Sequence, residues 1–223
     1  MTTGGGGAAS AVVLVLALCA SILLLADRLH RAARLHAECT RKLVHALMGL
    51  TAASFPWFFR EPLPVLLLCA AFAALLGGSR ACARLQAVHG VGRRTAGAVW
   101  FPVAVAVVFV AAAPRPAHYV IAILVLTLAD PAAALVGRVY GAHRFRVGEG
   151  WKSVEGSLAF FVVAAATIGA GLASTTPLGP FAVTLWAALI GTLLAAVEAA
   201  SPAGSDNVLV PVGALLLLRG AGA

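Results

Sequence analysis

The most unusual residue in this sequence is Asp130, an acid enclosed by apolar segments on both sides. It follows the run 120–129 without a break and precedes the run 131–136. Placing a carboxylate inside a long apolar segment costs free energy, so such residues usually serve a function. A carboxylate here can hold a metal ion or accept a proton, with a hydrogen bond between helices as the alternative.

The densest polar stretch of the chain follows at residues 137–157. It contains five glycines, four basic residues, two acids and two serines. Glycines let backbone amides approach an anion, while Lys and Arg neutralise phosphate oxygens. Ser153 and Ser157 lie one turn apart at a predicted helix start, where free amides also attract anions. The expected nucleotide-binding residues of this stretch are Gly137, Arg138, Gly141, Lys152, Ser153, Gly156 and Ser157.

Three further acids lie at the ends of apolar segments. Glu155 lies in the polar stretch, Glu198 ends a long apolar run, and Asp206 opens the last one. Together with Asp130 they form a candidate site for Mg²⁺, which prefers oxygen ligands and bridges phosphates. Two simpler explanations stay open: Glu155 pairs with Lys152 on the surface, or Asp206 caps a helix.

A second basic group precedes the second apolar segment. Arg41 and Lys42 are followed by His45, and Arg41 and His45 share a helical face because they lie one turn apart. Arg41 and Lys42 are candidate phosphate contacts. A basic membrane flank with an interfacial histidine explains the same pattern. Asn207, next to Asp206, is a further polar residue at the start of the last apolar run.

The composition explains what positions these residues. Hydrophobic residues make up 61% of the chain and charged residues 11%, whereas soluble domains average about a quarter charged. Only helices and closed barrels satisfy their backbone inside a bilayer. Barrel strands alternate polar and apolar residues, but the apolar runs here are continuous. We therefore expect an all-α, polytopic bundle of transmembrane helices.

The apolar runs predict eight spans, with seven as the alternative if the short last run does not cross. The expected spans are Ala11–Leu25, Leu43–Phe59, Leu63–Gly78, Ala96–Ala113, His118–Val136, Leu158–Ala173, Gly179–Val197 and Val208–Leu218. We expect a single domain over residues 1–223. Its segment 1–10 is Gly-rich and uncharged, which predicts a flexible N-terminus before a retained first helix rather than a signal peptide.

The basic residues predict the orientation of the chain. Thirteen of the 16 Lys and Arg residues fall in three alternate loops, at 28–42, 80–94 and 138–152. Such residues accumulate on the cytoplasmic side, so the polar site is expected there and the N-terminus outside. They flank spans without an aromatic stacking pattern, so nucleic acid is not an expected partner. The lipid bilayer is an expected partner, and the possibility of a homo-oligomer is left open.

Four blocks of this sequence resemble the polyprenol kinase family, which includes phytol kinase, the dolichol kinases and the CTP-dependent diacylglycerol kinase of yeast type. The blocks are RKLVH (41–45), LADPAAALVGRVYG (128–141), KSVEGSLAFF (152–161) and EA (198–199) with DNVLVP (206–211). The similarity extends over about residues 38–212. Chain length and short loops are most similar to the phytol kinase branch.

The resemblance implies phosphoryl transfer from CTP, with Mg²⁺, to an isoprenoid alcohol such as phytol or geranylgeraniol. Asp130, Lys152 and Glu155 are then the expected catalytic residues, with Asp130, Glu155, Glu198 and Asp206 around the metal. His45 and Asn207 belong to the motifs without an assigned role. A prokaryotic inner membrane is the expected location, with the site facing the cytoplasm. A diacylglycerol kinase, a phosphatidate cytidylyltransferase-like enzyme or a small transporter are the alternatives.

Overall fold

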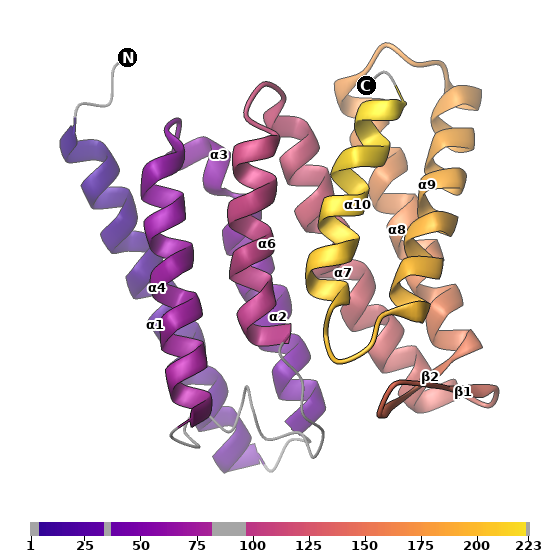
Figure 1. The fold of residues 1–223 in the computed structure, drawn as a ribbon, viewed down its shortest axis with the longest axis horizontal. Helices are drawn as coiled ribbons and strands as arrows, with labels where there is room; N and C mark the ends of the chain where they lie inside the picture. Colours follow the sequence, from indigo (N-terminus) through magenta and orange to yellow (C-terminus); the bar gives the residue numbers. More distant parts are fainter. Residues whose placement is uncertain (1–4, 34–36, 82–96, 222–223) are drawn as a thin grey trace.

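The computed structural model describes residues 5–33, 37–81 and 97–221, and 84% of them are helical. The expected all-α fold is confirmed for this part of the chain. The elements in chain order are α1 (Gly5–Ala33), α2 (Ala37–Ala53), α3 (Phe55–Phe58), α4 (Pro62–Ala81), α6 (Gly97–Ala111), α7 (Pro116–Tyr140), β1 (Arg144–Val147), β2 (Gly150–Ser153), α8 (Val154–Thr175), α9 (Pro180–Ala200) and α10 (Asp206–Gly220). Figure 1 shows the long helices side by side in a bundle.

Four of the described helices are long and apolar enough to cross a membrane. They are Gly7–Leu29, Pro116–Tyr140, Val154–Thr175 and Pro180–Ala200. Two shorter apolar stretches are Pro62–Gly78, within α4, and Gly97–Ala111, which is α6. These helices indicate an integral membrane protein, while the expected count of seven or eight spans is not confirmed by length and composition.

Helix α7 lies at the centre of the packing and contacts α2, α6, α8 and α10. Its buried Tyr119 donates a hydrogen bond from its hydroxyl to the Ala52 carbonyl of α2 at 2.7 Å. The Tyr119 ring also meets Phe109 of α6 edge to face, with the ring centroids 5.2 Å apart. One side chain thus ties three helices together, and it satisfies its polar atom while doing so.

Two glycines let neighbouring helices approach α7 closely. A methyl group at Gly49 of α2 would overlap the Thr127 side chain, and one at Gly171 of α8 would overlap Ile121. Small residues at helix crossings are typical of membrane bundles, where association depends on close van der Waals packing. These crossings hold α2 and α8 against α7, the helix that carries Asp130.

The second expected span, Leu43–Phe59, is the clearest difference between prediction and structure. Helix α2 ends at Ala53, and the short α3 follows after Ser54. Pro56 lies in the first turn of α3, where it has no N–H to continue the hydrogen bonding of α2. The carbonyl four residues before Pro56, at Ala52, accepts the Tyr119 hydroxyl instead.

The N-terminal segment also differs from the expectation. Helix α1 begins at Gly5, so residues 5–10 of the segment expected to be flexible are helical. Residues 1–4 lie outside the described part of the chain. So do Arg34, Arg84, Arg93 and Arg94 of the basic loops, and their contribution to the orientation stays a prediction.

A short β-hairpin between α7 and α8 was not predicted from the sequence. Strands β1 and β2 pair antiparallel, with Phe145 opposite Lys152 and Arg146 opposite Trp151. Gly148 in the turn has φ of +57°, a conformation that glycine adopts without steric cost. The hairpin lies at the same end of the bundle as the turn between α9 and α10 (Figure 1).

Substitution of Gly49 by Ala tests the close crossing of α2 and α7. The added methyl overlaps the buried Thr127 side chain, so we expect Gly49→Ala to destabilise the protein by about 1–3 kcal/mol, the usual cost of overpacking. Gly77→Ala is the matched control, because among the described residues nothing outside its own helix lies within 4 Å of the position of its methyl group. Thermal unfolding in detergent measures both, and equal midpoints for the two variants would contradict the crossing.

Candidate functional site

The hairpin end of the bundle encloses a pocket of about 700 Å³. It is formed by the start of α2, the end of α7, the hairpin, the start of α8 and the turn between α9 and α10. The residues chosen from the sequence that line it are Arg41, Lys42, Asp130, Gly137, Arg138, Lys152, Ser153, Gly156, Ser157, Glu198, Asp206 and Asn207. The fold therefore brings residues from all four motif blocks to one place.

At one side of the pocket, Lys42 and Asp130 form a buried ion pair. The Lys42 ammonium lies 2.6 Å from both carboxylate oxygens of Asp130, and each residue is only 6% exposed. Two charges removed from water in this way depend on each other, because either one alone is costly to bury. The pair explains how an acid is tolerated within the apolar helix α7.

His45 lies behind this pair and does not line the pocket. Its Nε2 is 3.6 Å from an Asp130 oxygen, and its ring packs edge to face on Phe101 with centroids 5.2 Å apart. The motif spacing that placed Arg41 and His45 on one helical face thus brings His45 next to the acid.

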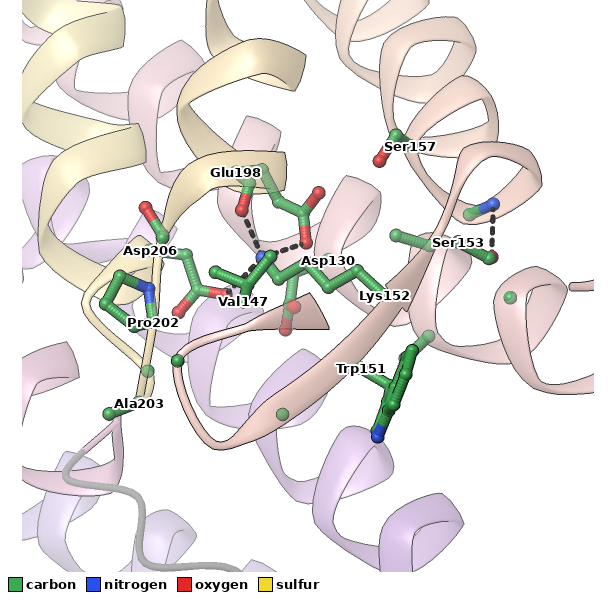
Figure 2. Close-up of a pocket in the computed structure, with 18 of the residues that line it drawn as sticks. Asp130, Val147, Trp151, Lys152, Ser153, Ser157, Glu198, Pro202, Ala203 and Asp206 are labelled. Atoms are coloured by element: carbon green, nitrogen blue, oxygen red, sulfur yellow. Dashed lines mark hydrogen bonds and ion pairs between the residues drawn. The ribbon is translucent and has the colours of Figure 1, made fainter. Parts of the chain in front are cut away.

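A second ion pair crosses the pocket from the hairpin to α9. Lys152 contacts the Glu198 carboxylate at 2.7 Å and also donates to the Glu198 backbone carbonyl. An Asp206 oxygen lies 3.8 Å from the same ammonium. Figure 2 shows Lys152 reaching from its strand to a point between the two acids. Two lysines and three acids thus face one another, so a phosphate group would compete for the lysines.

The motif glycines have a packing role that the sequence did not reveal. Methyl groups at Gly137 and Gly141 would each come within 2.9 Å of the Ser153 hydroxyl oxygen. At Gly156, a methyl group would lie 2.9 Å from the Ala133 carbonyl oxygen. These glycines let the end of α7 touch the start of α8. Gly141 does not line the pocket, so its expected contact with nucleotide gains no support from its position.

Ser153 lies at the centre of that contact and caps α8. Its hydroxyl accepts a hydrogen bond from the Gly156 backbone N–H at 3.1 Å, as expected for a serine before the first turn of a helix. Ser157, one turn later, has a buried hydroxyl oxygen without a hydrogen-bond partner among the described residues. Figure 2 shows both serines on the α8 side of the pocket.

The structure does not bring Glu155 together with the other acids. Its carboxylate accepts hydrogen bonds from the His143 backbone at 3.1 and 3.3 Å, and it pairs with the His143 ring at 2.7 Å. Glu155 is absent from the pocket lining. Nor does it pair with Lys152, the simpler explanation left open by the spacing.

Asn207 and Arg138 line the pocket but also hold its walls. The Asn207 amide donates to the Gly97 carbonyl at 2.8 Å, which joins the start of α10 to the start of α6. Arg138 lies 4.0 Å from the Cys39 sulfur on α2 and is otherwise exposed. Asp206 accepts a hydrogen bond from the Asn207 backbone N–H at 3.0 Å, which agrees with a place in the first turn of α10.

Sequence reasoning overlooked the turn between α9 and α10. Ser201, Pro202, Ala203 and Gly204 all line the pocket, and Pro202 approaches Gly148 at the tip of the hairpin. The signal that could have identified them is the cluster Ser-Pro-Ala-Gly-Ser, which is typical of turns. It lies directly between Glu198 and Asp206.

The acids in the pocket suit a divalent cation only in part. Within the described residues, no group of three or more His, Cys, Asp or Glu side chains is arranged to hold a metal ion. Glu198 and Asp206 nevertheless both lie near the Lys152 ammonium, at 2.7 and 3.8 Å. Mg²⁺ commonly uses one or two carboxylates together with substrate phosphates.

Comparison with known proteins gives one informative match. The chain is 30% identical to a protein named phytol kinase from Synechocystis sp. over 200 residues, which cover 88% of this chain and 85% of that protein. No protein-family model matches the chain, and no solved structure matches it. The matched region is long enough to include all of the pocket residues together.

The Lys42–Asp130 pair can be tested by its effect on stability. Lys42→Met leaves the Asp130 carboxylate buried without its partner, so we expect a loss of about 3–5 kcal/mol in the free energy of unfolding. The double variant Lys42→Met with Asp130→Asn carries no unpaired charge and should recover much of that loss. Unfolding of purified protein in detergent measures both, and equal stabilities would show that the pair is not buried as described.

Proposed function

The chain belongs to the phytol and polyprenol kinase-like family, and we propose that it transfers the γ-phosphoryl group of CTP to an isoprenoid alcohol. It is a kinase that acts on an alcohol. The observation that supports the proposal best is the pocket at one end of an apolar bundle, where two lysines and three acids from distant segments converge. The choice of CTP rests on the motif resemblance, and the prenol on the phytol kinase relative.

The position of the pocket suits two substrates that arrive from different phases. A nucleotide approaches from water, whereas a prenol stays in the bilayer with its hydroxyl at the interface. The end of a membrane bundle is where the two can meet. The apolar faces of the helices next to the pocket would bind the prenyl chain. The polar lining of the pocket would not, so the chain would stay away from the phosphates.

The basic residues of the pocket are proposed to bind the phosphates. Lys152 is held by the Glu198 carboxylate, and phosphate oxygens can take the place of that carboxylate. Lys42 contributes its charge to the site while it stays paired with Asp130. Arg41 and Arg138 line the same wall and can contact two oxygens at once. The buried Ser157 hydroxyl is a further donor, since no described residue accepts its hydrogen.

Glu198 and Asp206 are the residues proposed to hold Mg²⁺, because Lys152 already marks a cation position between them. When bound, Mg²⁺ would neutralise negative charge on the phosphates. Lys152 would then serve the phosphates rather than the acids. Glu155, bonded to His143 outside the pocket, is left out of this proposal.

Asp130 is proposed to orient the alcohol and take its proton. In the reaction, the hydroxyl oxygen forms a bond to the γ-phosphorus, the bond from that phosphorus to the bridging oxygen breaks, and CDP leaves. The hydroxyl proton needs an acceptor at the membrane edge of the pocket. Asp130 lies in helix α7 at that edge, and Lys42 and His45 surround its carboxylate.

The membrane arrangement is part of the proposal. The start of α1 and the end of α10 lie at the same end of the bundle, opposite the hairpin (Figure 1), which supports an even number of crossings. We propose eight spans, with the hairpin end in the cytoplasm of a prokaryotic cell, where CTP is available. The basic residues of the hairpin agree with this orientation.

A product assay tests the proposed activity. Membranes containing the protein are incubated with labelled CTP, ATP, GTP or UTP and with phytol, geranylgeraniol, farnesol, undecaprenol or diacylglycerol. We expect a prenyl monophosphate and CDP. Release of diphosphate with CMP on the lipid would indicate a cytidylyltransferase instead, and phosphorylation of diacylglycerol alone would reject the prenol.

Two single substitutions test the assigned residues. Asp130→Asn and Lys152→Ala should each lower the rate of prenol phosphorylation by at least about 100-fold, the scale seen when one charge-stabilising group is removed from a site. The matched controls Glu61→Gln and Arg60→Ala change exposed residues between α3 and α4 and should keep the activity. Wild-type turnover in either folded pocket variant would reject its assignment.

A further inference from the structure

Glu155 and His143 close the base of the β-hairpin from opposite sides. His143 directly precedes β1, and Glu155 lies two residues after β2, in the first turn of α8. The Glu155 carboxylate binds both the backbone N–H and the ring Nδ1 of His143. The Val154 N–H donates to the His143 carbonyl at 3.0 Å. Together these bonds form a clamp, here called the Glu155–His143 clamp.

The clamp lies outside the lining of the pocket. The His143 side chain is 80% exposed and that of Glu155 is 26% exposed, and neither residue lines the pocket. A substrate in the pocket would therefore not touch them. They can therefore affect the reaction only through the β-hairpin, whose base they hold in place.

That segment carries Lys152. A hairpin with two four-residue strands is marginally stable by itself, so its direction depends on what fixes its ends. The base is fixed by the clamp, and the tip at Gly148 lies against Pro202. Between them, Lys152 extends from β2 to the Glu198 carboxylate, as Figure 2 shows. Loss of the clamp would free the base and widen the range of positions open to the Lys152 ammonium.

We propose that the Glu155–His143 clamp positions Lys152 for the phosphates of the donor nucleotide. The inference rests on the kinase function proposed above and replaces the metal-ligand role that the sequence suggested for Glu155. Glu155 is accordingly a positioning residue, comparable to the outer residues that orient metal ligands, whose loss typically lowers affinity about 10–100-fold.

The test measures CTP binding to full-length protein in detergent, so that it does not depend on turnover. The variants are Glu155→Ala, Glu155→Gln, Lys152→Ala and the double variant Glu155→Ala with Lys152→Ala. Glu61→Ala is the matched control, because Glu61 is an exposed acid in the turn before α4. Initial rates over a range of prenol concentrations give the KM for the alcohol in the active variants.

A positioning role predicts a specific pattern. Glu155→Ala should raise the Kd for CTP at least about tenfold, the lower end of the range for lost orienting residues, and leave the prenol KM within about twofold. Glu155→Gln should stay near wild type, because its amide oxygen still accepts the His143 N–H. The double variant should bind no more weakly than Lys152→Ala alone, since coupled residues are not additive.

Other patterns would overturn the inference. If Glu155 holds the metal, Glu155→Gln will bind CTP as weakly as Glu155→Ala. The increases in Kd caused by Glu155→Ala and by Lys152→Ala will then multiply in the double variant. If Glu155→Ala binds CTP with the wild-type Kd, the clamp does not position Lys152, and the proposed kinase function is unaffected. A wild-type protein that binds no nucleotide and phosphorylates no alcohol overturns both.

Limited trypsin digestion gives a measure of the hairpin that is independent of nucleotide. Cleavage after Arg144 and Arg146 should be faster in Glu155→Ala than in wild type or Glu61→Ala, because the clamp no longer holds β1. If Glu155→Ala does not fold, His143→Ala takes its place, since it removes the ring and keeps the backbone bonds. We then expect a Kd about twofold higher, and unchanged binding and cleavage would reject the clamp.

Discussion

The constraint on which the site depends is that charge removed from water must be paired. Lys42 and Asp130 are both buried at one side of the pocket, and neither is tolerable there without the other. Lys152 and Glu198 repeat the arrangement across the pocket. One ion pair thus joins α2 to α7, and the other joins β2 to α9. In the proposed function, the phosphates of a nucleotide would take the place of the Glu198 carboxylate on Lys152, while the Lys42–Asp130 pair stays intact.

Close packing of α7 on α8 is the second requirement. Gly137 and Gly156 meet around the Ser153 hydroxyl, which also caps α8. A side chain at either glycine would push the two helices apart, and with them Asp130 on one and the hairpin on the other. The glycines of the motif are thus explained by the approach of two helices. Phosphate binding by their amides is a separate proposal.

Much of the candidate site followed from the sequence because its residues interrupt apolar segments or lie at their ends. Asp130, Glu198 and Asp206 had to reach the same end of a bundle of alternating helices, and the structure places all three in one pocket. Glu155 could not be placed this way. It lies on the first turn of α8, where neighbouring residues point in different directions, and the preceding hairpin brings His143 within reach. The hairpin itself has only eight paired residues and little alternation to reveal it.

The sequence by itself determined the class of the protein: apolar composition requires helices in a bilayer, and the motif blocks predict a kinase of prenols, in agreement with the phytol kinase relative. Only the tertiary structure decided which charges pair, that α2 stops before Pro56, and that Glu155 pairs with His143 outside the pocket lining. The physical reason is the range of the forces involved. Hydrophobicity and helical periodicity act along the chain and can be read from it, whereas ion pairs and close helix contacts join residues that are adjacent only in space.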